Sequence, residues 1–121
     1  MFRIRSCRFS SGLGLACEVE IVCLLNGEIY QLTASGCDCV AALNRAVKEV
    51  FASQELSVRS LPDGKDVFEA YPVQDLGCVR VVHCIVFWPD NSTSRGMAPN
   101  WYCALVQAYE QGINASLSPH P

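Results

Sequence analysis

The stretch that decides the fold is Gly36-Cys37-Asp38-Cys39-Val40-Ala41-Ala42-Leu43, because the chain contains a second version of it. The second version is Gly96-Met97-Ala98-Pro99-Asn100-Trp101-Tyr102-Cys103-Ala104-Leu105, which also begins with glycine and continues into a helix-like pattern. The two glycines lie 96 − 36 = 60 residues apart in a chain of 121 residues. A unit of about 60 residues is only marginally stable alone. The sequence therefore predicts two similar units packed together as one domain.

The first half predicts three strands and a helix. Apolar and polar residues alternate in the strand-like runs, and Asn26-Gly27 is typical of a two-residue hairpin turn. Apolar residues then recur at spacings of three and four over residues 40–52, which predicts an amphipathic helix with Asp38 as its N-cap. The strands are predicted at residues 2–9, 17–25 and 28–33.

The second half predicts the same order of elements. The run 78–88 is almost continuously apolar, which indicates a strand that is buried on both faces. A loop is expected over residues 89–94 and a helix over residues 100–113, with Pro99 just before its start. Residues 116–121 are expected to form a disordered tail. The strands of this half are predicted at residues 55–60, 67–73 and 78–88.

These elements predict an α+β fold of duplicated βββα units with pseudo-two-fold symmetry. Two small antiparallel sheets are each covered by a helix. The first repeat is placed at residues 2–52 and the second at residues 54–115, within a single domain of residues 1–115.

The composition limits the classes of partner. Half of the residues are hydrophobic and 17% are charged, which predicts apolar surface for self-association and hence a homodimer. The net charge of −3 and the scattered basic residues argue against binding nucleic acid. No run approaches the ~20 apolar residues of a membrane helix, and no apolar segment of a secretory signal follows Met1. We expect a cytoplasmic protein.

The eight cysteines admit a disulfide framework or reduced, buried thiols. The absence of an export signal favours reduced thiols. The pair Cys37 and Cys39 forms a CxC motif, and no second pair lies at the spacing of a zinc site, so we expect no metal and no cofactor. Four cysteines lie in apolar stretches, where a free thiol packs as a small hydrophobe: Cys23, Cys78, Cys84 and Cys103.

The two glycine-led motifs resemble those of the C-terminal regulatory (dimerisation) domain of 2-isopropylmalate synthase and citramalate synthase. The family motif GNGPVDALxxA lies without a gap on residues 36–46, and GVSxNIxxAxxxAYxxxxN lies on residues 96–114. The resemblance covers about residues 2–115. Agreement is found at Gly36, Val40, Ala42, Leu43, Ala46, Gly96, Asn100, Ala104, Ala108, Tyr109 and Asn114.

The resemblance implies a duplicated βββα fold and an effector site at the glycine-containing turns, near a dimer interface. It departs from the family at Asp38, which replaces a glycine and whose carboxylate would repel that of a leucine-like effector. The catalytic barrel of the synthases is not part of the 121 residues, so we do not expect synthase activity. The implied ligand-binding residues are Gly36, Asp38, Cys39, Ala42, Gly96, Ala98, Asn100 and Trp101.

Three functions remain open at this point. The first is a stand-alone dimerising module that holds a small carboxylic or apolar metabolite between the two helix starts, whose free N–H groups suit an anion. The second is a cofactor-free enzyme, a cyclase or isomerase, that uses the same pocket. The third is a structural partner of a separate catalytic chain. The candidate catalytic residues of the second function are Asp38, His83, Cys39 and Tyr102.

Two of these predictions have simpler alternatives. His83, within an apolar strand, is expected to be a core or interface residue unless it acts as a base. Trp101 and Tyr102 are expected to pack in the core or at an interface, unless they line a pocket for a larger apolar ligand.

Overall fold

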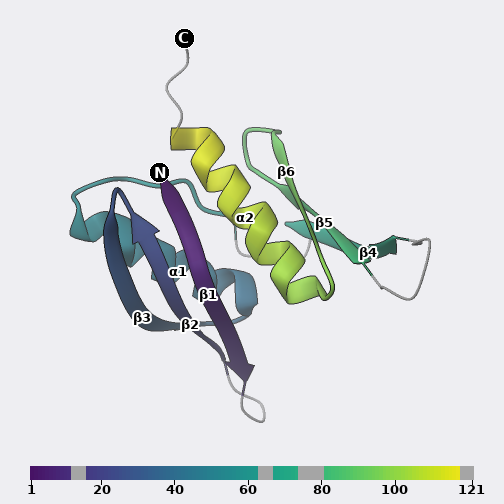
Figure 1. Ribbon diagram of the computed structural model, residues 1–121, viewed down its shortest axis with the longest axis horizontal. Helices are drawn as coiled ribbons and strands as arrows, with labels where there is room; N and C mark the ends of the chain where they lie inside the picture. Colours follow the sequence, from purple (N-terminus) through teal and green to yellow (C-terminus); the bar gives the residue numbers. More distant parts are fainter. Residues whose placement is uncertain (12–15, 63–66, 74–80, 118–121) are drawn as a thin grey trace. The chain divides into compact units, whose positions relative to one another are not determined.

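A computed structural model describes residues 1–11, 16–62, 67–73 and 81–117 (Figure 1). The chain divides into two compact units, Met1–Asp63 and Gly64–Pro121. Each unit contains a three-stranded antiparallel sheet followed by a helix. The predicted α+β class with two βββα units is therefore confirmed.

In the first unit a helix covers one face of a meander sheet. The turn between the second and third strands is the predicted Asn26-Gly27 hairpin, in which both residues have positive φ angles of 51° and 88°. Asp38 caps the helix, since its Oδ1 accepts a hydrogen bond of 2.8 Å from the N–H of Ala41. The elements are β1 (Phe2–Ser11), β2 (Cys17–Leu25), β3 (Glu28–Gly36) and α1 (Cys39–Ser53).

The core of the first unit lies between α1 and the sheet. Alternate residues of β2 point towards the helix, and Val19, Ile21 and Cys23 have no solvent exposure. The rings of Phe2 and Phe51 meet at a centroid distance of 5.4 Å. Burial of one strand face and one helix stripe accounts for the alternating pattern in the sequence.

The second unit has the same order of elements. Cys84 and Val86 of its central strand face the helix and are fully buried. The indole of Trp88 packs against Tyr109, with the ring centroids 5.5 Å apart. Its Nε1 donates to Ser94 Oγ at 2.8 Å, and that hydroxyl donates to the carbonyl of Ala108 at 2.6 Å. The elements are β4 (Phe68–Val73), β5 (Val81–Phe87), β6 (Thr93–Ala98) and α2 (Trp101–Leu117).

Two glutamines of α2 cover the outer edge of β6. The main-chain N–H of Arg95 donates to Gln111 Oε1 at 2.7 Å, and that of Met97 donates to Gln107 Oε1 at 3.1 Å. These side chains satisfy main-chain donors that an edge strand otherwise leaves to solvent.

Several predictions about the second half are wrong. The predicted strand at residues 55–60 is absent, because residues 56–62 have no regular secondary structure. The third strand of the second unit is instead β6, where we expected a loop and a helix start. The strand β5 is not buried on both faces, since Cys84 and Val86 towards α2 are fully buried but Phe87 on the other face is 37% exposed; residues 78–80 lie outside the described part.

The predicted disordered tail begins too early. Ser116 and Leu117 belong to the last turn of α2, and the remainder of the predicted tail lies outside the described residues. Ser116 Oγ donates to the carbonyl of Ile113 at 2.7 Å, which ties this turn to the helix. Neither described helix combines the length and the apolar character that crossing a membrane requires.

The spacing of the repeat is 62 residues at the helices rather than 60. The caps (100 − 38), the helix starts (101 − 39) and the ends of the preceding strands (98 − 36) all give this offset. By this offset the counterpart of Gly36 is Ala98, and that of Gly96 is Ala34. Gly96 therefore lies inside a strand rather than at a helix start, which corrects the alignment of the two motifs.

Candidate functional site

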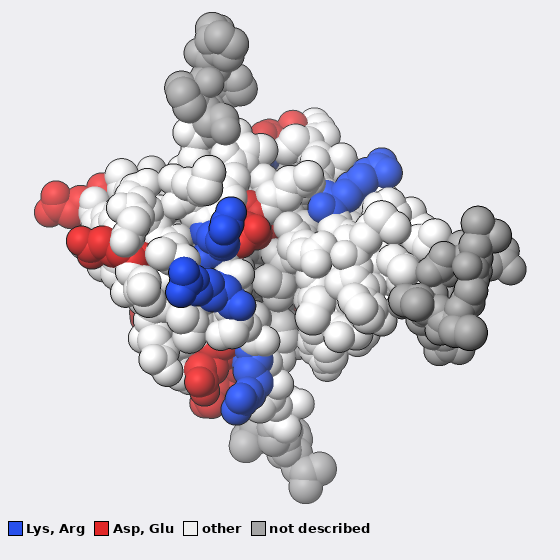
Figure 2. Space-filling model, viewed as in Figure 1, with Lys and Arg blue, Asp and Glu red and all other residues white. Residues whose placement is uncertain are grey.

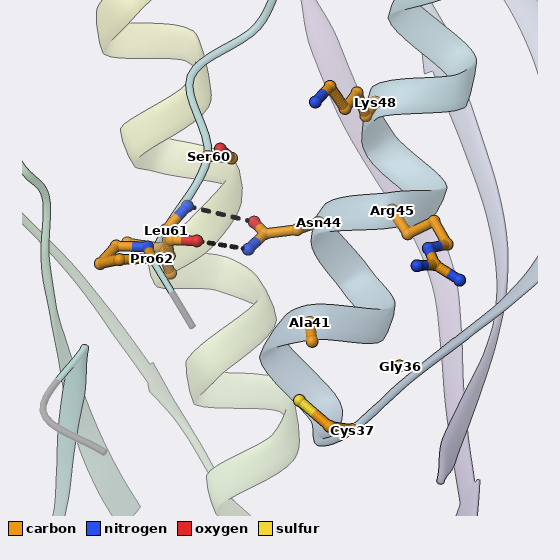
Figure 3. A pocket seen from close by; sticks show the side chains of 9 residues that line it. All are labelled: Gly36, Cys37, Ala41, Asn44, Arg45, Lys48, Ser60, Leu61 and Pro62. Carbon is orange, nitrogen blue, oxygen red and sulfur yellow. Dashed lines mark hydrogen bonds between the residues drawn. The ribbon is translucent and has the colours of Figure 1, made fainter. Parts of the chain in front are cut away.

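A hollow of about 540 Å³ lies beside α1 in the first unit (Figure 3). One wall is the helix, a second is the segment that follows it, and the end of β3 closes the base. The lining residues are Gly36, Cys37, Ala41, Asn44, Arg45, Lys48, Ser60, Leu61 and Pro62.

Asn44 holds the second wall in place. Its Nδ2 donates to the carbonyl oxygen of Leu61 at 2.7 Å, and its Oδ1 accepts from the N–H of Leu61 at 3.2 Å (Figure 3). Leu61 itself is buried, with 3% of its surface exposed. These two hydrogen bonds hold the irregular segment around Leu61 against α1, although the segment does not pair with a strand.

The two charged residues that line the hollow are both basic. Arg45 and Lys48 lie one turn apart on α1 and are both exposed. None of the nine described lining residues carries a carboxylate. On the face that Figure 2 shows, basic and acidic residues are both present and neither forms a large continuous patch. Two cations on one helix can bind a small anion such as a carboxylate.

Gly36 allows β3 to approach α1 closely at the base of the hollow. A Cβ atom at this position would lie 2.6 Å from the main-chain nitrogen of Ala42, which is closer than real Cβ contacts. Glycine is therefore required here by space. The close approach places Cys37, the next residue, on the rim of the hollow with its side chain exposed.

The other predicted site residues of the first unit do not line the hollow. The carboxylate of Asp38 caps α1, and Ala42 is fully buried against the sheet. The Sγ of Cys39 lies 3.4 Å from the Sγ of Cys17. Burial, with a contribution from Cys17, raises the pKa of the Cys39 thiol to about 12, so this thiol stays protonated at neutral pH.

In the second unit the predicted residues have separate roles. Gly96 and Ala98 are buried on β6, and Asn100 caps α2 by accepting a hydrogen bond of 2.9 Å from the N–H of Cys103. Trp101 stacks on Phe68, with 6.2 Å between the centroids and 9° between the rings. Trp101 also lines a second, apolar hollow of about 400 Å³ with Phe68, Ala70, Tyr71, Pro72 and Val82.

The catalytic candidates have different partners. His83 Nδ1 lies 2.8 Å from the hydroxyl of Tyr71, on the sheet face away from α2. Tyr102 instead stacks on Trp101, at a centroid distance of 3.7 Å. Asp38 and Cys39 are held at the start of α1. Among the described residues, no group of three metal-ligating side chains lies close enough together to hold an ion.

The seven described cysteines are free thiols. Cys23 and Cys84 are buried as predicted, and burial raises the pKa of each thiol to about 11. Cys103 is exposed, so the prediction that it packs in the core is wrong, and Cys78 lies outside the described residues. Cys103 lies on the solvent side of α2, because its neighbours Ala104 and Leu105 take the buried positions.

Sequence reasoning named only Gly36 among the nine lining residues and missed the other eight, including Asn44, Arg45, Lys48 and Ser60. The signal for Arg45 and Lys48 was present, since two cations follow a required glycine on the polar side of a predicted helix. Ser60 was assigned to a strand, so its place beside α1 could not be foreseen.

No protein-family model matches this chain, and it has no significant match among curated proteins. The resemblance to the regulatory domain of 2-isopropylmalate synthase thus stays a prediction that rests on the motifs at Gly36 and Gly96.

Proposed function

We propose that this protein is a cytoplasmic, dimerising domain that binds a small carboxylate, in the manner of the allosteric domain of 2-isopropylmalate synthase. The observation that carries the proposal is the hollow beside α1, where Arg45 and Lys48 lie among lining residues without a carboxylate. The two βββα units are consistent with the resemblance.

The size and chemistry of the hollow suit a metabolite. Ligand sites commonly measure about 300–1,000 Å³, and 540 Å³ falls within this range. A guanidinium binds a carboxylate through two parallel hydrogen bonds, and an ammonium one turn away adds a second positive charge. Pro62, which is exposed, supplies apolar surface for a short aliphatic chain.

A regulatory or binding role has more support than catalysis. The side chain of Asp38 is engaged in capping, and the pKa of about 12 leaves Cys39 without a thiolate nucleophile at neutral pH. In the proposed role the ligand-bound domain acts on a separate catalytic chain or on its own dimer partner.

Isothermal titration calorimetry on the full chain tests the proposal. The probes are leucine, 2-oxoisovalerate and succinate, with leucinamide as the matched compound that lacks a carboxylate. We expect at least one carboxylate to bind, and Arg45→Gln and Lys48→Gln each to weaken its binding about tenfold or more. Arg8→Gln, an exposed arginine on β1, is the control and should leave the affinity unchanged.

Carboxylate binding that persists unchanged in both Arg45→Gln and Lys48→Gln would contradict the assigned site. Native mass spectrometry of the purified protein provides an independent measurement, because a co-purified ligand appears as a mass increment. If that increment is lost in Arg45→Gln and retained in Arg8→Gln, the ligand occupies the hollow beside α1.

A second candidate is an apolar ligand in the hollow beside Trp101, because its lining is formed by aromatic and aliphatic side chains. Such a ligand should quench or shift the fluorescence of Trp101, which is 37% exposed, whereas Trp88 is only 3% exposed. A signal that is retained in Trp88→Phe and lost in Trp101→Phe assigns the change to Trp101, and carboxylate binding that is intact in Trp101→Phe assigns the two ligands to separate sites.

A further inference from the structure

One face of the sheet of the second unit points away from α2 and carries exposed side chains. Along each strand alternate side chains point to α2, and the others point away from it. Cross-strand pairing arranges the outward residues in rows, of which two are Glu69–Ile85–Arg95 and Tyr71–His83–Met97. Tyr71, Phe87 and Met97 on this face are 42%, 37% and 52% exposed.

The corresponding face of the first sheet has polar rows and one strongly exposed apolar side chain, Ile29, which pairs with Leu24 and is 62% exposed. Its outward rows include Arg8–Glu20–Thr33, in which all three residues are polar and exposed. Such a row is well solvated, as expected for the outer side of an antiparallel sheet. On the second sheet all three strands contribute a large exposed side chain to this face, Tyr71 from β4, Phe87 from β5 and Met97 from β6, and such a group of side chains indicates an interaction surface.

The charges on this face are complementary to those of a second copy of the same face. Glu69 lies on β4 and Arg95 on β6, at opposite ends of one row, and Ile85 lies between them on β5. A two-fold axis along β5 turns a second sheet over so that its β6 lies above β4 and its β4 above β6. Glu69 of each copy then lies opposite Arg95 of the other copy.

We propose that two copies of the protein dimerise by stacking this face of the second sheet about a two-fold axis along β5. Glu69 then faces the partner's Arg95, Ile85 packs on the partner's Ile85, and Tyr71 lies over the partner's Met97. The interface is isologous, as in most homodimers. Stacked sheets with nearly aligned strands are a common packing, with about 10 Å between the sheets.

The size of the face sets the expected affinity. Three strands at a spacing of about 4.8 Å, with a rise of about 3.4 Å per residue, form a platform of roughly 15 by 20 Å. Two such platforms with their side chains bury on the order of 1,000 Å² in total, which is at the lower end of specific interfaces. We expect a dissociation constant on the order of 10 µM.

Sedimentation equilibrium of the full chain over about 1–300 µM tests the proposal. The wild type should pass from monomer to dimer within this range. Glu69→Arg and Arg95→Glu should each raise the dissociation constant about tenfold or more, because each places like charges opposite one another. The double variant should return it to within about threefold of the wild type. Arg8→Glu and Glu20→Arg on the first sheet are the matched controls and should leave it unchanged.

If circular dichroism shows that a charge-reversed variant does not fold, Ile85→Lys tests the interface in its place. It places two ammonium groups on the axis and should abolish the dimer. A wild type that stays monomeric at 300 µM overturns the proposal and assigns the face to a different partner. A dimer that tolerates both single charge reversals and Ile85→Lys, or that the double variant fails to restore, also overturns it.

This inference rests on the dimerising part of the proposed function. The dimer interface and the carboxylate site can be refuted separately. The charge-reversed positions lie in the second unit, whereas the hollow beside α1 lies within the first. A monomer that still binds carboxylate refutes the dimer alone, and a dimer that binds no carboxylate refutes the ligand site alone.

Discussion

At the scale of single residues, Ser94 links three parts of the second unit. Its hydroxyl accepts a hydrogen bond from the Trp88 indole and donates one to the carbonyl of Ala108 on α2. Both contacts are buried, so water cannot replace the hydroxyl at either of them. The side chain thus joins the β5–β6 turn, the sheet edge and the helix through one oxygen atom.

Replacing Ser94 tests this role. Ser94→Ala leaves a buried indole N–H without its acceptor, so we expect a loss of about 1–3 kcal/mol in the free energy of unfolding. Urea titration followed by tryptophan fluorescence measures the change. Ser35→Ala, at an exposed position on β3, should change stability by less than about 0.5 kcal/mol. Equal effects of the two substitutions would contradict the role of Ser94.

Asn44 has a comparable role in the first unit. Asn44→Ala removes both hydrogen bonds to Leu61, and we expect a loss of about 1–2 kcal/mol in stability. Hydrogen exchange of the Leu61 amide should accelerate, because that N–H loses its acceptor. The amide of Ala41, which Asp38 holds, should exchange at its wild-type rate and is the internal control.

At the scale of the elements, Gly96 sets how closely α2 packs on β6. A Cβ at Gly96 would lie 2.7 Å from the main-chain nitrogen of Ala108 and still closer to the carbonyl oxygen of Ala104. Gly112 has a similar role on the helix, because a Cβ there would overlap the Trp88 indole. The second helix therefore has a small residue on each side of its contact with the sheet.

Gly96→Ala should force the helix and the strand apart. The opposing atoms are main chain and cannot move alone, so we expect a loss of about 3 kcal/mol in stability, as in an overpacked core. Gly27→Ala is the matched control: nothing lies within 4 Å of a Cβ there, and only the positive φ of 88° opposes the substitution. Its cost should be about 1 kcal/mol. Thermal unfolding compares the two, and a milder effect at Gly96 would contradict the packing.

The first unit was predicted well because short sequence motifs determine its hairpin turn and the start of its helix. Asn26-Gly27 adopts the expected left-handed conformation, and Asp38 caps the expected helix. In the second unit the turn from β5 to β6 is three residues longer, spanning 88–92 against 26–27, and contains no such dipeptide. Gly96 was consequently read as a helix start, although it serves close packing inside a strand.

The candidate site was harder to predict than the fold. Gly36 was singled out as the first residue of a repeated helix-start motif, and the structure gives a different physical reason, the close approach of β3 to α1. The positions of Arg45 and Lys48 on one wall follow from the predicted helix. The opposite wall depends on Asn44, which binds the main chain of Leu61, 17 residues away. Such a tertiary contact leaves no periodic pattern in the sequence. The predicted strand at residues 55–60 also placed that wall elsewhere.

At the scale of the whole molecule, the buried thiols predict how stability depends on pH. In the unfolded chain cysteines ionise near pH 9, whereas burial raises the pKa of Cys23 and Cys84 to about 11 in the folded protein. The unfolded state therefore binds fewer protons between these values, and stability falls as the pH rises. Tyr109, whose pKa burial also raises, adds to the fall at higher pH.

Urea unfolding at pH 8.0, 9.5 and 10.5 measures this dependence. We expect the free energy of unfolding to be greatest at pH 8.0 and lowest at pH 10.5. Cys84→Ala should be less stable at every pH but should show a shallower decline, since one of the shifted groups is gone. Cys103→Ala, which removes an exposed thiol, should retain the wild-type slope. A flat profile for the wild type would contradict the buried thiols.

The glutamines that bind the outer edge of β6 have a consequence for colloidal behaviour. Fibrillar growth of β proteins proceeds through unsatisfied main-chain groups, to which an incoming strand can add. Gln107 and Gln111 already occupy two of these groups on β6, and the helix that carries them stands beside the strand. The addition of further strands at this edge of β6 is thereby hindered. Association through the outward face of the sheet, as proposed above, then stops at the dimer.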